Sequence, residues 1–71
     1  MFKVGDLVKI VYPGEKPTDW ALKAYKKGSV FCLVDNGEPS GLEQHKLFHG
    51  AMLLEENKYV ILREDRIEKV G

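Results

Sequence analysis

Hydrophobic and polar residues alternate along residues 4–12, the first recognisable element of the chain. One face carries Val8, Ile10 and Tyr12, and the other carries Leu7, Lys9 and Val11. Because strand side chains alternate between the two faces of a sheet, this pattern predicts a β-strand. Residues 13–17 contain two prolines and a glycine, which cannot continue a ladder of backbone hydrogen bonds, so we expect the strand to end there.

Residues 18–27 carry the clearest helix signal. Thr18 suits the N-cap, because its hydroxyl can accept a hydrogen bond from the first turn. Gly28 suits the left-handed residue that follows the last turn. Four residues recur at helical spacing on one side: Trp20, Ala21, Ala24 and Tyr25. We expect this side to pack on the sheet, since a helix of about ten residues is too short to be stable alone.

Residues 29–34 form the most hydrophobic segment. The five consecutive apolar residues 30–34 predict a strand that is covered on both faces, with the helix as the second cover. The sequence Asp35-Asn36-Gly37-Glu38 is typical of a tight hairpin turn. Ser40 and Glu43 match a capping box, which favours a short helix or turn over residues 41–47.

The remaining residues predict three further strands. Residues 51–55 and 58–64 are joined by a turn at Glu56-Asn57, where asparagine tolerates the left-handed backbone. Asp65-Arg66 is expected to turn the chain into a last strand over residues 67–70. With the two earlier segments, this gives five short strands and one helix in a single, mainly β domain that spans residues 1–71.

Composition narrows the classes of function that so small a domain can have. The 71 residues are 44% hydrophobic and 31% charged, as in a folded protein. A core of this size cannot also enclose a deep cofactor pocket, so we expect no cofactor. Eleven basic and eleven acidic residues give a formal charge of zero, which argues against a strong, sequence-independent grip on nucleic acid.

Redox chemistry and location are also constrained. Cys32 is the single cysteine and cannot form an internal disulfide, and its place between Phe31 and Leu33 predicts a buried thiol. No stretch at the N-terminus resembles a signal peptide, and no run approaches the ~20 apolar residues that cross a bilayer. We therefore expect a cytoplasmic protein without membrane contact.

The order of these elements is similar to a known architecture. Gly5-Asp6-Leu7-Val8-Lys9-Ile10 resembles the entry to small Src-homology-3-like barrels, including KOW-type and prokaryotic or phage-encoded versions. Lys27-Gly28-Ser29-Val30 looks like the entry to their second strand. Residues 59–62 and 66–70 are similar to their closing strands, whereas residues 13–27 and 38–49 depart from the pattern. The resemblance implies a five-stranded barrel, here with a short helix in its first long loop, that binds proteins or nucleic acid through its loops and is rarely an enzyme.

The candidate chemical groups do not assemble into a metal site or an active site. His45 and His49 are four residues apart, but no Glu lies where a zinc protease needs one, so we expect both on the solvent side. The acidic pairs Glu55-Glu56 and Glu64-Asp65 fall at predicted turns, where solvation favours ordinary carboxylates. We therefore expect neither a bound metal nor catalysis.

Lysines and aromatic residues gather in the first loop and the helix. Lys16, Lys23, Lys26 and Lys27 are interleaved with Trp20 and Tyr25. Two interpretations remain open for this cluster. The aromatic rings pack in the core while the lysines are solvated, or the rings stack on bases while the amines meet phosphate. The loop over residues 13–17 is likewise either a plain connector or a rigid recognition edge.

These observations favour a small non-catalytic protein–protein interaction module. We expect a regulator or inhibitor that binds a larger protein, a host protein if the chain comes from a phage, through its first loop and helix. The expected contact residues are Tyr12, Lys16, Trp20, Lys23, Tyr25, Lys26 and Lys27. The alternative is a nucleic-acid-associated barrel that uses the lysine-rich helix over residues 18–27. We expect a monomer or a weak homodimer, because the break at Pro39 leaves a strand edge open.

Overall fold

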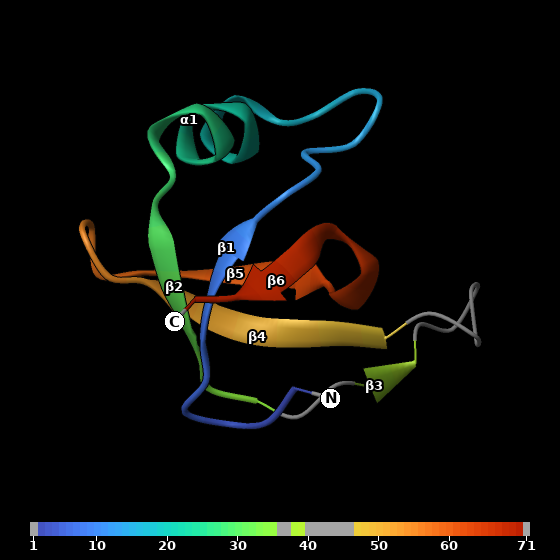
Figure 1. Ribbon diagram of the computed structural model, residues 1–71, viewed down its shortest axis with the longest axis vertical. Coiled ribbons are helices and arrows are strands. Elements are labelled where there is room, and N and C mark those ends of the chain that lie inside the picture. Colours follow the sequence, from blue (N-terminus) through green and yellow to red (C-terminus); the bar gives the residue numbers. More distant parts are fainter. Residues whose placement is uncertain (1, 36–37, 40–46, 71) are drawn as a thin grey trace.

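Short strands and one helix follow one another along the computed structural model, which describes residues 2–35, 38–39 and 47–70 (Figure 1). The elements are β1 (Leu7–Ile10), α1 (Asp19–Lys27), β2 (Val30–Leu33), β3 (Glu38–Pro39), β4 (Leu47–Leu53), β5 (Lys58–Arg63), the 3-10 turn η1 (Glu64–Arg66) and β6 (Ile67–Lys69). Within these residues the fold is therefore mainly β, as the sequence predicts.

The strands form one antiparallel sheet in which β4, the longest strand, pairs with three others. β5, β4, β2, β1 and β6 are neighbours in that order, and the two-residue β3 pairs with the start of β4. One edge of β4 pairs with β5 from Phe48 to Leu53, while its other edge pairs with β2 and β3. β5 and β6 lie at the two ends of this path, and within the described residues they do not pair with each other. Five antiparallel strands and one short helix are thus confirmed, whereas a closed barrel is not.

The core lies on one side of the sheet. Its buried apolar residues are Val8, Ile10, Ala24, Phe31, Leu33, Ala51, Leu53, Val60, Leu62 and Ile67. Burial alternates along β1 and along most of β5, so period two correctly predicts Val8 and Ile10 as inward residues. Tyr12 does not continue that inner face. It lies two residues beyond the end of β1 and is 45% exposed.

Local capping signals set the bounds of α1. The Thr18 hydroxyl accepts a hydrogen bond from the Ala21 amide at 3.4 Å, and Gly28 takes the left-handed conformation with φ 71°. α1 lies above one end of β1 and β2 (Figure 1). Ala24 is its buried residue, and Trp20 and Ala21 pack partly against the core. The prediction that Tyr25 shares this face is wrong, since Tyr25 is 42% exposed. Contact is confined to the narrower stripe through Trp20, Ala21 and Ala24.

The prediction that β2 is covered on both faces is also wrong. Phe31 and Leu33 are fully buried, but Cys32 is half-buried and Val34 is exposed. Trp20 packs edge-to-face on Phe31, with ring centroids 6.4 Å apart, so α1 covers the same side of the sheet as the core. The opposite side of β2, which carries Cys32, is left without the helix.

The β4–β5 hairpin turns at the predicted place. Asn57 has φ 52°, the left-handed conformation that asparagine tolerates. β4 begins at Leu47, four residues earlier than the sequence pattern predicts. Residues 36–37 and 40–46 lie outside the described part of the chain, and with them most of the predicted tight turn and of the short helix over residues 41–47. In the described part, no helix has the length and apolarity that crossing a membrane requires.

Candidate functional site

A groove of about 230 Å³ separates the first loop from the end of β5 and η1. Its apolar walls include Tyr12, Pro13, Pro17 and Trp20 from the loop and the start of α1. Its cationic side chains are Lys16, Arg63 and Arg66. None of the described residues that line the groove carries a carboxylate. The arrangement can therefore take up an apolar group beside a negative charge.

Sheet register brings the two sides of the groove together. Ile10 at the end of β1 pairs with Ile67 at the start of β6. The ladder continues past the strands, because the backbone amides of Val11 and Tyr12 both donate to the Arg66 carbonyl oxygen, at 2.9 and 3.4 Å. The first loop is thereby tied to η1, although more than fifty positions separate Tyr12 from Arg66 in the sequence.

Arg66 is the most constrained cation of the groove. Its guanidinium carbon lies 5.9 Å from the centroid of the Tyr12 ring, within the range of a cation–π contact. Gly14 passes so close that an added Cβ would lie 3.0 Å from Arg66 Nη1, and Gly14 has φ 100°. Arg66 Nε is buried and has no hydrogen-bond partner among the described residues. The Arg66 guanidinium is thus held in place without an ion pair to any carboxylate in the described part of the chain.

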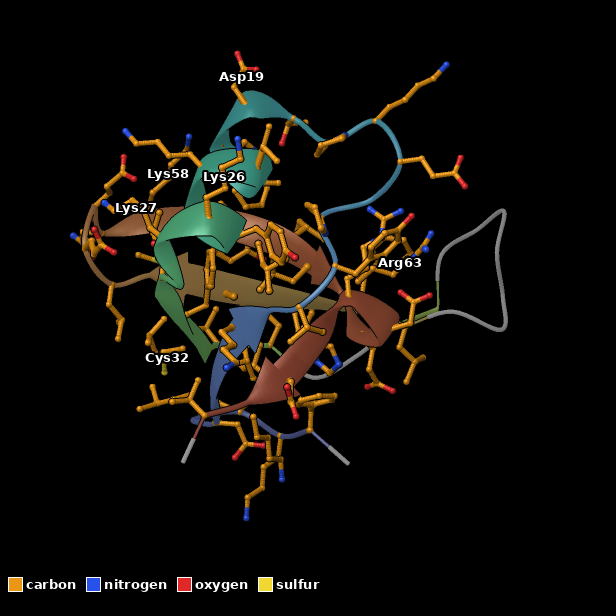
Figure 2. The ribbon with its side chains drawn as sticks, turned by 45° about the horizontal axis from the view of Figure 1, so that its top comes forward. Asp19, Lys26, Lys27, Cys32, Lys58 and Arg63 are labelled. Carbon is orange, nitrogen blue, oxygen red and sulfur yellow. The ribbon has the colours of Figure 1, made fainter. Side chains whose placement is uncertain are left out.

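Arg63 differs from Arg66, because its charge is met locally. Arg63 Nε donates to Asp65 Oδ1 at 2.6 Å. Figure 2 shows Arg63 on the side of the molecule opposite Lys27 and Lys58. Arg63 therefore borders the groove as one half of an ion pair.

A second depression, of about 240 Å³, lies on the other side of Trp20. It is lined by Asp19, Trp20, Lys23, Ala24, Lys27, Ser29, Leu53 and Glu56. Lys27 Nζ is 2.6 Å from Glu55 Oε2, and the Ser29 hydroxyl donates to Glu55 Oε1 at 2.9 Å. The hydrogen bond from Lys27, followed by that from Ser29, lowers the pKa of the Glu55 carboxyl, and the same Lys27–Glu55 bond raises the pKa of Lys27. This pairing reduces the positive charge that a nucleic-acid interface on α1 would need.

The structure divides the residues that the sequence singles out. Tyr12, Lys16 and Trp20 line the groove. Lys23 and Lys27, again with Trp20, line the second depression. Tyr25 and Lys26, which the sequence pattern also places among the contact residues, are exposed on α1 and line neither hollow, so they are not part of the groove. Trp20 is half-buried, so its ring belongs both to the core contact with Phe31 and to the two surfaces.

Sequence reasoning missed the cations on the far wall of the groove. Arg63 and Arg66 were read as residues of a strand end and a turn, since nothing local to residues 63–66 indicates the first loop. The prolines Pro13 and Pro17 were singled out, and they do line the groove.

The prediction that His49 lies on the solvent side is wrong. It is 1% exposed, and its Nε2 is 2.8 Å from Glu64 Oε2. Phe2 contacts the His49 ring edge-to-face at 5.7 Å between centroids. Position 49 falls on the inward face of β4 together with Ala51 and Leu53, so a hydrogen-bonded histidine is buried there. Glu64 is thereby paired with His49, whereas its position at a predicted turn indicates only a solvated carboxylate.

The described residues contain no cluster of side chains that could bind a metal ion. Among residues 2–35, 38–39 and 47–70, no three or more His, Cys, Asp or Glu side chains are grouped so as to hold a metal ion. His45 lies outside these ranges.

The comparisons with known proteins leave the geometry as the basis for assigning a function. No family model matches the chain, and neither the curated proteins nor the solved structures give a match. The likeness to Src-homology-3-like barrels accordingly rests on the short motifs and the order of the strands.

Proposed function

We propose that this chain is a non-catalytic module that binds a larger protein through its first loop and the start of α1, and so regulates or inhibits that protein. The observation that supports this proposal most directly is the groove between the first loop and η1. Its volume of about 230 Å³ suits one or two side chains and is below the ~300 Å³ at which pockets for small-molecule ligands begin.

The residue types that line the groove support this proposal. Aromatic residues and arginine are enriched where proteins meet, and they supply most of the residues with large contributions to binding. Tyr12, Trp20 and Arg66 are residues of these types and line the same groove. Tyr12 is 45% exposed, so its ring has area left for a partner to cover.

The loop is also restrained before any partner arrives. Pro13 and Pro17 fix two backbone angles, and the hydrogen bonds to the Arg66 carbonyl oxygen hold residues 11 and 12. A restrained loop loses little conformational entropy on binding, which leaves more of the contact energy for affinity. The loop over residues 13–17 thus acts in this proposal as a recognition edge.

The test compares two tyrosines of nearly equal exposure. A tagged chain is used to capture proteins from the cells in which it is made, and captured candidates are purified and titrated by calorimetry. Tyr12→Ala should weaken the complex at least tenfold, since Tyr12 lines the groove. Tyr25→Ala is the matched control, because Tyr25 is 42% exposed on α1 outside the groove.

The outcome of this comparison decides the proposal. A partner that loses affinity with Tyr12→Ala and keeps it with Tyr25→Ala supports binding through the groove. A partner equally sensitive to both substitutions, or to neither, contradicts it. Circular dichroism of both variants excludes unfolding as the cause of a loss.

A further inference from the structure

We propose that the groove takes an acidic segment of the partner protein, with a carboxylate at Arg66 and Lys16 and a neighbouring apolar side chain between Tyr12, Pro17 and Trp20. This inference rests on the proposed function and adds the chemistry of the ligand to it.

The charge of the groove departs from that of the whole chain. The chain as a whole is formally neutral, with eleven basic and eleven acidic residues. The described lining residues of the groove nonetheless include three cations and no carboxylate. Asp65 meets the charge of Arg63. Lys16 and Arg66 have no carboxylate partner among the described residues, so two positive charges remain for a ligand to neutralise.

Arg66 is positioned to receive a carboxylate. The Tyr12 ring and Gly14 flank its guanidinium, and its Nε is buried without an acceptor in the described part of the chain. A partly desolvated cation without a counter-ion is unfavourable, so an anion at the guanidinium would relieve that cost. The planar, forked donors of arginine fit a carboxylate in two-point contact, and the preset position of Arg66 lowers the entropy lost in forming it.

The walls of the groove select what accompanies the carboxylate. Tyr12, Pro17 and Trp20 present apolar surface, and a volume of about 230 Å³ admits one large aliphatic or aromatic side chain. A protein segment with Glu or Asp next to Leu or Phe offers both groups at once. A nucleic-acid backbone offers the charge without the apolar partner, and the neighbouring Lys27 is already paired with Glu55. These features favour an acidic protein segment over nucleic acid.

The probe is a blocked eight-residue peptide with a central Glu-Phe-Glu-Leu sequence, titrated into the 15N-labelled full chain at low salt. A second peptide in which Gln replaces both Glu residues isolates the charge. We expect chemical-shift changes at the amide of Tyr12 and the indole N–H of Trp20. We also expect the Gln peptide to bind at least fivefold more weakly, because Lys16 and Arg66 then lose their anion.

Substitutions in the chain test where the carboxylate of the peptide binds. Lys16→Glu reverses one groove charge on an exposed side chain and should weaken the acidic peptide at least tenfold. Arg66→Gln should weaken it similarly, and its spectrum reports whether the loop still folds. Lys26→Glu is the matched control, since Lys26 is exposed on α1 outside both hollows, and should change the affinity less than threefold.

Several results would overturn the inference. Equal binding of the Gln peptide, or equal losses with Lys16→Glu and Lys26→Glu, would show that a carboxylate in the groove is not recognised. A ten-nucleotide oligothymidine that shifts the same resonances at lower concentration than the peptide would assign the groove to nucleic acid. A natural partner that depends on Tyr12 but tolerates both Lys16→Glu and Arg66→Gln would overturn the acidic ligand while leaving the proposed function intact.

Discussion

The two hollows beside Trp20 differ in how their charges are met. At the second depression, the lining residues Lys27 and Ser29 both donate hydrogen bonds to Glu55, so the charge of Lys27 is met within one small network. In the groove, Arg66 lies against Tyr12 and Gly14 without a carboxylate among the described residues. The second depression thus has carboxylates of its own, since Asp19 and Glu56 line it and Glu55 pairs with Lys27. The groove leaves positive charge available, which is why the groove rather than the lysine-rich face of α1 is the better candidate for recognition.

Truncating the shared wall is expected to have the largest effect. Trp20→Ala removes the edge-to-face contact with Phe31 and part of both hollows. We expect a loss of about 2–3 kcal/mol in the free energy of unfolding, toward the low end for aromatic truncation because Trp20 is only half-buried. Urea denaturation followed by circular dichroism measures it. Trp20→Phe should lose less than half as much, and equal losses would contradict packing as the cause.

The groove alone is perturbed by Gly14→Ala. The residue has φ 100°, and its new Cβ would lie 3.0 Å from Arg66 Nη1. Backbone strain together with displacement of the guanidinium should cost about 1–2 kcal/mol of unfolding free energy. Gly5→Ala is the matched control, because Gly5 has φ 94° but nothing within 4 Å of the added Cβ. A smaller loss in Gly14→Ala than in Gly5→Ala would show that Arg66 does not constrain this loop.

The Lys27–Glu55 pair beside the second depression is tested by the pH dependence of stability, where we expect the smallest of these effects. The Lys27 hydrogen bond lowers the pKa of the Glu55 carboxyl in the folded state. The stabilisation is therefore complete above the ordinary pKa of a glutamate and is lost as the pH falls through the lowered folded value. The unfolding midpoint of the unsubstituted chain should decline more between about pH 5 and pH 3 than that of Glu55→Gln.

Asp6 provides a second, independent acid-sensitive group for comparison. The backbone amide of Lys3 donates to its carboxyl at 2.9 Å and lowers its pKa, with Lys69 also contributing. Asp6→Asn should therefore remove a separate part of the acid sensitivity, and the double variant should remove both. Parallel midpoint curves for Glu55→Gln and the unsubstituted chain would show that the Lys27–Glu55 pair does not favour the folded state.

Local signals in the sequence predicted those features that depend on neighbouring residues. Thr18 and Gly28 mark the ends of α1 because caps act within one turn. Asn57 marks the hairpin turn because few side chains tolerate a positive φ. Alternation along β1 predicted Val8 and Ile10 as inward residues. These features need no knowledge of which strands pair.

The groove could not be predicted in the same way, because it depends on long-range register. Only the pairing of Ile10 with Ile67 brings Arg66 under the Tyr12 ring, and no pattern local to either segment specifies that pairing. The exposure of Tyr25 likewise depends on which side of α1 meets Phe31, and Trp20 makes that contact. His49 is a different case. Its two-residue spacing from Ala51 and Leu53 indicates the same inward face, but the predicted strand begins at residue 51 and therefore leaves His49 out.

The tie between the first loop and η1 has a consequence for how the two ends of the sheet open. Tyr12 and Trp20 line one wall of the groove and Arg66 lines the other, so a ligand that contacts both walls holds the segment after β1 against the segment before β6. Binding restricted to the folded arrangement stabilises it in proportion to the logarithm of ligand concentration over Kd. The amide protons of the short strand β6 would then exchange more slowly in the complex than in the free chain. Proteases would also cleave the chain near β6 more slowly in the complex.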